Sequence, residues 1–201
     1  MSAIDLSSYF GLTAMTLLTL NILLGLVMSM KYNPVRNWPH RRINTFKLHN
    51  WTAYIALTIA SIHPLIILFS STAKFTLLDI LYPVHAPKQP WINVLGALAL
   101  YALSFVVLTS YFRRELGRRT WKTLHFTAYG VAALFFVHGI LTDPKLKDAP
   151  IDFLDGEKVY VELCLLLVIV AVGYRVRWQL RQPPPRIHRP KPAAVARRSL
   201  R

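Results

Sequence analysis

The chain alternates long apolar stretches with short polar segments. Five stretches reach about 20 mostly apolar residues, the length that an α-helix needs to cross a bilayer. They are residues 8–30, 49–73, 91–112, 121–142 and 158–177. The pattern predicts an all-α, polytopic membrane bundle of five transmembrane helices. No basic residue precedes the first stretch and positive charge follows it, so we expect an uncleaved anchor rather than a signal peptide.

The composition supports a membrane protein with basic loops. Of the 201 residues 54% are hydrophobic, the mean hydropathy is +0.36, and the formal net charge is +15. A basic protein that binds nucleic acid spreads its Lys and Arg over a folded surface, whereas here they lie in blocks between apolar runs. The expected partner of this chain is therefore a lipid bilayer, and no nucleic acid is expected.

The blocks of positive charge predict an orientation. Segments 31–47 and 113–122 hold five Lys and Arg each, and the tail from Arg175 holds nine. The alternate loops hold the other five, together with six of the nine acidic residues. Because basic loops stay in the cytoplasm, the N-terminus is expected outside and the C-terminus inside. We expect a multi-pass protein of the cell membrane, most simply a bacterial inner membrane.

Two of the apolar stretches share one pattern. The sequence HNWTAYIALTIASIH runs from His49 to His63, and HFTAYGVAALFFVH runs from His125 to His138. Both helices follow a basic segment and should run in the same direction. His49 and His125 are then expected near the inner face, and His63 and His138 near the outer face. Ionisable side chains within a membrane are expensive, which makes all four candidates for a functional site.

Two imidazoles at each of two levels favour haem over other metals. Zinc or copper takes three or four protein ligands, whereas haem iron takes two axial imidazoles from opposite sides. The single cysteine, Cys164, excludes both a thioether attachment and a cysteine-ligated cluster within this chain. The prediction is two b-type haems, with His49 and His125 at the inner iron and His63 and His138 at the outer. The alternative is that the imidazoles only donate to carbonyls of neighbouring helices.

The two histidine spacings differ by one residue. Fourteen steps of about 100° return within about 40° of the starting face, but thirteen steps miss it by about 140°. We therefore expect a distorted helix near His125. Pro64, which removes a backbone donor directly after His63, is expected to kink its helix near the outer site.

The two histidine helices and the segment RRELGRRTWKTLH, residues 113–125, resemble the ferric reductase-like transmembrane domain of ferric-chelate reductases and NADPH oxidases. The chain also resembles the haem subunit of the periplasmic methionine sulfoxide reductase system. The resemblance covers about residues 45–175 and implies two stacked b-haems held by two histidine pairs on two helices. The chain departs from the family in having five spans instead of six and no flavin and nicotinamide domain. FAD or NAD(P)H is therefore expected only through a separate partner.

These considerations divide the chain into three parts. Residues 1–44 are expected to form an N-terminal transmembrane helix and a basic cytoplasmic loop, 45–178 the haem-binding core, and 179–201 a disordered, basic, Pro-rich cytoplasmic tail. An inner haem needs cations for its propionates. The candidates are Arg41, Arg42, Lys47, Arg118, Arg119 and Lys122.

The predicted function is transmembrane electron transfer by a di-haem cytochrome b. The donor would be a cytoplasmic flavoprotein or a quinol, and the acceptor an extracytoplasmic ferric chelate or a periplasmic reductase. The chain would then be an oxidoreductase component, ferric reductase-like, or a haem subunit dedicated to a periplasmic partner. A haem-free structural or transport protein is a further alternative. Cytochromes of the b561 type match less well, because they spread their four haem histidines over four helices.

Overall fold

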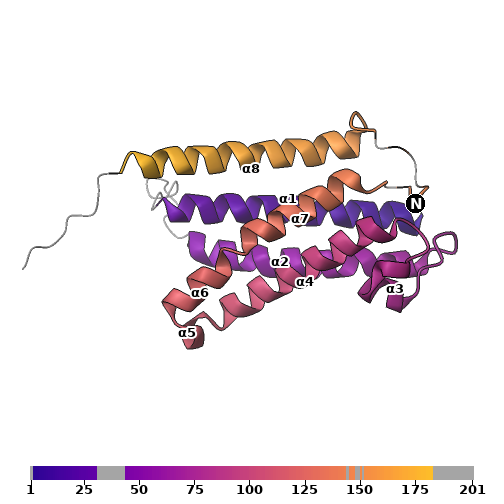
Figure 1. Ribbon diagram of the computed structural model, residues 1–201, viewed down its shortest axis with the longest axis horizontal. Helices are drawn as coiled ribbons and strands as arrows, with labels where there is room; N and C mark the ends of the chain where they lie inside the picture. The colour runs from indigo at the N-terminus through magenta and orange to yellow at the C-terminus, as the bar shows by residue number, and fades with distance from the viewer. Residues whose placement is uncertain (1, 31–43, 144, 148–149, 151, 183–201) are drawn as a thin grey trace, which may run out of the picture.

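The computed structural model describes residues 2–30, 44–143, 145–147, 150 and 152–182, which form a bundle of long helices with no strand (Figure 1). The long helices are α1 (Ala3–Ser29), α2 (Thr45–Ile66), α4 (Pro90–Tyr111), α6 (Arg118–His125) with α7 (Ala128–Leu141), and α8 (Gly156–Leu180). The short ones are η1 (Ile67–Phe69), α3 (Leu77–Leu81), η2 (Pro83–His85) and α5 (Arg113–Leu116).

Five segments are long and apolar enough to cross a membrane, as predicted. They are α1, α2 with η1, α4, α6 with α7, and α8. The chain is thus an all-helical, multi-pass membrane protein. The first span begins five residues earlier than expected because Ser2 caps it. The Ser2 hydroxyl accepts from the Asp5 amide at 3.1 Å and the Asp5 carboxylate accepts from the Ser2 amide at 2.8 Å, which is a capping box.

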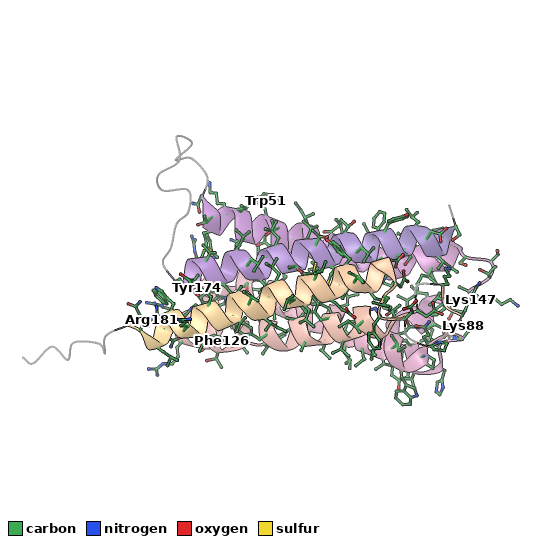
Figure 2. The ribbon with its side chains drawn as sticks, turned by 90° about the horizontal axis from the view of Figure 1, so that it is seen from above. Trp51, Lys88, Phe126, Lys147, Tyr174 and Arg181 are labelled. Atoms are coloured by element: carbon green, nitrogen blue, oxygen red, sulfur yellow. The ribbon has the colours of Figure 1, made fainter. Side chains whose placement is uncertain are left out.

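The histidine-bearing helices run in the same direction. In Figure 1, α2 and the α6–α7 pair both run from the end with α5, here called the basic end, to the end with α3, here called the loop end. Helices α1, α4 and α8 run the opposite way. Figure 2 shows Phe126, Tyr174 and Arg181 toward the basic end and Lys88 and Lys147 at the loop end.

Apolar side chains fill the bundle and also cover its outside. The core includes Met15, Ala56 and Phe136, which are nearly inaccessible. Leu166 and Val170 on α8 are more than half exposed. Lipid tails are as apolar as leucine, so this outer surface is stable in a bilayer.

The helix is interrupted directly after His125, as the spacing predicted. The amide of Phe126 is shared between the carbonyls of Lys122 and Thr123, and the amide of Tyr129 bonds to the carbonyl of Phe126 at 3.2 Å. Such i→i−3 bonds belong to a tighter turn with about 120° per residue. The tighter turn adds rotation in the direction that offsets the thirteen-residue shortfall. His138 is thereby turned back toward the face that carries His125.

The span that holds His63 ends soon after Pro64. Helix α2 continues two residues beyond Pro64 and then changes to the 3₁₀ turn η1. The structure therefore places the proline in the last turn of α2, beside His63. Two other predictions, the roles of Arg41 and Arg42 and the disorder of the tail beyond residue 182, lie outside the described residues.

Candidate functional site

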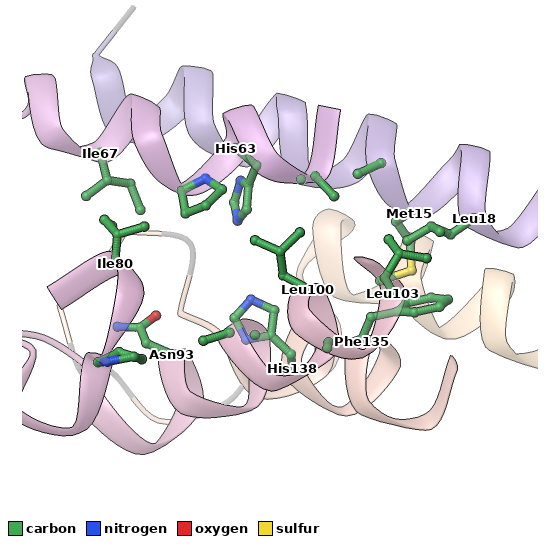
Figure 3. A pocket seen from close by; sticks show the side chains of 18 of the residues that line it. Met15, Leu18, His63, Ile67, Ile80, Asn93, Leu100, Leu103, Phe135 and His138 are labelled. Carbon is green, nitrogen blue, oxygen red and sulfur yellow. The ribbon is translucent and has the colours of Figure 1, made fainter. Parts of the chain in front are cut away.

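Two adjoining cavities at the loop end are lined by both His63 and His138. The larger, here called the apolar cavity, encloses about 910 Å³ counted to its open mouth. In Figure 3 the imidazole of His63 and the imidazole of His138 approach it from opposite sides, with Leu100 between them in the view. The smaller, here called the polar cavity, encloses about 750 Å³.

His63 is held by helix α1. Its Nδ1 donates to the carbonyl of Ser7 at 2.7 Å, and the Ser7 hydroxyl donates to the carbonyl of His63 at 2.8 Å. The ring lies against Gly11, where an added Cβ would come within 3.0 Å of its Cε1. A side chain larger than hydrogen at position 11 would therefore press on the imidazole.

His138 is held in the same way by helix α4. Its Nδ1 donates to the carbonyl of Ile92 at 2.8 Å. The ring lies on Gly96, where a Cβ would come within 2.7 Å of Cε1 and 3.0 Å of both ring nitrogens. This is the tightest glycine contact among the described residues.

A buried amide clamp fixes the end of α7 that carries His138. The side chain of Gln89 accepts from the Asp143 amide at 3.0 Å and donates to the Asp143 carbonyl at 3.2 Å. Gln89 is buried and has a left-handed backbone, with φ +47° and ψ +49°, at the start of α4. A non-glycine residue in that region costs free energy, and such residues often mark functional sites. The clamp joins the first turn of α4, which contains Ile92, to the end of α7.

The partner of Nδ1 fixes the tautomer. A carbonyl oxygen can only accept, so an Nδ1 that bonds to one must carry the hydrogen. The Nε2 lone pair is then free to bind a metal, and the hydrogen bond makes the imidazole a better ligand. This holds for His63, for His138 and also for His49, whose Nδ1 lies 3.1 Å from the carbonyl of Asn21.

His49 and His125 meet at the basic end of the bundle. Their ring centres are 6.2 Å apart and their planes are inclined by 72°. Two imidazoles that bind one metal from opposite sides at about 2.0–2.1 Å, the bond length to zinc, have ring centres about 6.3 Å apart. Rotation of either ring about that common axis leaves the distance unchanged. The separation of the ring centres is therefore compatible with one metal ion between the two rings.

The fourth histidine has a different partner from the other three. Nδ1 of His125 lies 3.2 Å from the hydroxyl of Ser110 on α4, which also accepts from the indole N–H of Trp121 at 3.4 Å. A hydroxyl can donate or accept, so it orients the ring without fixing its tautomer. The Trp121 ring lies beside the imidazole, with centres 5.2 Å apart.

Each histidine helix thus has one holding helix. Both histidines of α2 bond to α1, and both histidines of α6–α7 bond to α4. Three of the contacts share one arrangement, a carbonyl at position i and a glycine at position i + 4. The pairs are Ser7 and Gly11, Asn21 and Gly25, and Ile92 and Gly96. Sequence analysis did not select these residues.

The side chains at each level suit haem better than a metal that takes three or four protein ligands. Each level offers two imidazoles, and in the described part of the chain no three His, Cys, Asp or Glu side chains gather into a metal site. The outer pair lines the apolar cavity, whose other side chains are apolar except for Asp79 and Asn93. Three imidazoles have Nδ1 bound and Nε2 free for iron, in space that glycines keep open.

The predicted propionate partners on α6 lie at the surface. Arg118, Arg119 and Lys122 are exposed, and the Lys122 ammonium lies 5.8 Å from the centre of the Phe126 ring. Lys47 is exposed at the start of α2. None of them lines either loop-end cavity.

Comparison with known proteins identifies the family. The model of the ferric reductase like transmembrane component matches residues 10–136, which is more than half of the chain. The match includes the first span, which lies before residues 45–175, the part of the chain for which the sequence motifs indicated the resemblance. It ends two residues before His138. No curated protein and no solved structure matched the chain. With its five candidate membrane spans and paired histidine helices, the chain belongs to the ferric reductase-like transmembrane family.

Proposed function

We propose that this protein carries electrons across a membrane through two b-type haems, one held by His49 and His125 and the other by His63 and His138. The observation that carries the proposal is the 6.2 Å between the ring centres of His49 and His125, which suits two axial ligands on one iron. The family match supports a membrane electron-transfer component, because it covers three of the four histidines.

The protein's own residues hold and insulate the two centres. When bound, each haem iron would accept and release one electron at a time. The carbonyls of Ser7, Asn21 and Ile92 orient three of the imidazoles and increase their basicity, which favours the oxidised iron. Leu103 and Phe135, both buried, give the apolar cavity part of its apolar lining.

Electrons are proposed to enter at the basic end and to leave at the loop end. The basic end would face the cytoplasm, since it carries most of the described Lys and Arg. A separate flavoprotein or a quinol would supply electrons there. At the loop end the acceptor would be a ferric chelate or a periplasmic reductase. The polar cavity places His138 near that surface, beside the polar side chains of Thr142 and Asp143.

Haem counting with single-histidine variants tests the proposal. The purified full chain should contain two haems per polypeptide, with the reduced-minus-oxidised spectrum of low-spin, bis-imidazole b-haem. His63→Ala should lower the count to one, and so should His49→Ala, each through a different haem. The exposed His85 provides the control, because His85→Ala should keep both haems. A haem-free wild-type protein, purified from cells with ample iron and haem precursor, would make the four histidines structural.

A further inference from the structure

The two loop-end cavities differ in the polar side chains that line them, although they share His63 and His138. Only Asp79 and Asn93 among the other residues of the apolar cavity have polar side chains. The polar cavity adds side chains from α1, α7 and α8 and the segments beside them. They are Ser7, Ser8, Thr142, Asp143, Glu157 and Lys158.

Lys158 is the buried cation of the polar cavity. It is 4% exposed, and its ammonium donates to the carbonyl of Gly139 on α7 and to that of Thr142, the C-cap of α7. An ammonium has three N–H donors, so one remains after these two bonds. In the part of the chain that the structure describes, no third acceptor lies within hydrogen-bond distance of it. No other Lys or Arg among the described residues lines either cavity.

The carboxylates beside Lys158 already have donors. Glu157 accepts from the Ser8 hydroxyl at 2.6 Å, and Asp143 accepts from the amides of Lys145 and Lys147 at 2.9 and 2.8 Å. Lys158 also lies in the first turn of α8, whose N-cap, Asp155, makes no side-chain capping bond. The positive end of the helix dipole at this terminus favours an anion.

Haem has one apolar edge and one edge with two carboxylates. We propose that the carboxylate edge of the outer haem lies in the polar cavity and that one propionate accepts a charge-assisted hydrogen bond from Lys158. This inference rests on the proposed function. It assigns the outer haem a binding residue on α8, whereas the cations first considered lie on the basic side of the chain. The apolar edge then lies among Leu100, Leu103 and Phe135.

The test compares haem b with its dimethyl ester, in which both propionates are uncharged. The full chain carrying His49→Ala, which removes the inner site, is prepared without haem and titrated with each compound. Lys158→Met should weaken haem b binding by at least about tenfold, which corresponds to 1.4 kcal/mol. The same substitution should change the affinity for the dimethyl ester by less than about twofold. Lys158→Arg should restore most of the preference for haem b, and Lys147→Met, at an exposed loop-end position, should retain all of it.

The outcomes separate this inference from the proposed function. If Lys158→Met weakens both compounds equally, Lys158 only caps α7, and the inference is wrong while the outer haem stands. An unchanged affinity for haem b leads to the same conclusion. Absence of haem binding in the His49→Ala protein, with Lys158 intact, would overturn the proposed outer site itself.

Discussion

Gly96 offers the sharpest test of how the chain holds an axial imidazole. A Cβ at this position would lie 2.7 Å from Cε1 of His138 and 3.0 Å from both ring nitrogens. Carbon atoms in favourable contact are about 3.5–4.0 Å apart, so the ring must retreat by almost 1 Å. It cannot do so without lengthening the 2.8 Å bond from its Nδ1 to the carbonyl of Ile92.

The cost of Gly96→Ala follows from three contributions. Overpacking typically costs about 1–3 kcal/mol, and loss of the Nδ1 hydrogen bond costs about 1 kcal/mol. Alanine is the better helix former and returns about 1 kcal/mol. The net penalty, about 1–3 kcal/mol, applies to the geometry that is proposed to bind the outer iron. Affinity for the outer haem should therefore fall by roughly 5- to 150-fold.

The assay is haem per chain in the purified protein, with the low-spin signal of the bis-imidazole centre. Other glycines supply a graded series. Gly11→Ala, with its Cβ 3.0 Å from His63, should have an intermediate effect, and Gly25→Ala, 3.4 Å from His49, a small one. Gly130→Ala, on the same helix as His138 but with nothing within 4 Å, is the control. Full occupancy and an unchanged spectrum for Gly96→Ala would refute the reasoning.

Three further predictions concern other contacts. Gln89→Ala removes both hydrogen bonds of the amide clamp and should lower the free energy of unfolding by about 1–3 kcal/mol, measured by thermal unfolding in detergent. Gln89→Gly, which relieves the left-handed strain, should lose less. Ser110→Ala leaves Nδ1 of His125 without its partner and should alter the spectrum of the inner haem alone, whereas Ser110→Thr should not. Hydrogen bonds from Thr76, the N-cap of α3, lower the pKa of the Asp79 carboxyl below 3.8. They therefore stabilise the fold above that pH, and this stabilisation is lost as the pH falls through the pKa of the folded state. Asp79→Asn should abolish this dependence of the stability of α3 on acid pH. Amide hydrogen exchange of the α3 backbone, measured as a function of pH, checks this.

The five spans could be predicted because a bilayer requires a continuous apolar length. Local chemistry decided where they end. The capping box moved the start of the first helix to Ala3, and Pro64 came in the last turn of α2. The break after His125 was predictable as well, because thirteen residues cannot present two side chains to one face of a regular helix.

The residues that hold the imidazoles could not be predicted in the same way. Gly96 contacts His138 only because α4 packs on α7, and a hydrophobic pattern does not specify which spans are neighbours. Lys158 was counted with the lysines of the outer loops. Lys158 can be buried because its ammonium donates to backbone carbonyls at the end of α7. One of them belongs to Gly139, 19 positions earlier in the chain.

The division between holding and histidine-bearing helices has a consequence for assembly. The α1–α2 hairpin contains one proposed ligand for each iron together with its hydrogen-bond partner, and α4 with α6–α7 contains the other proposed ligand for each. Neither half includes a complete site. A growing chain would therefore expose two oriented but single imidazoles until the second half enters the membrane. Cofactor insertion would then fasten the halves together, so loss of haem would be expected to loosen the whole bundle rather than one pocket.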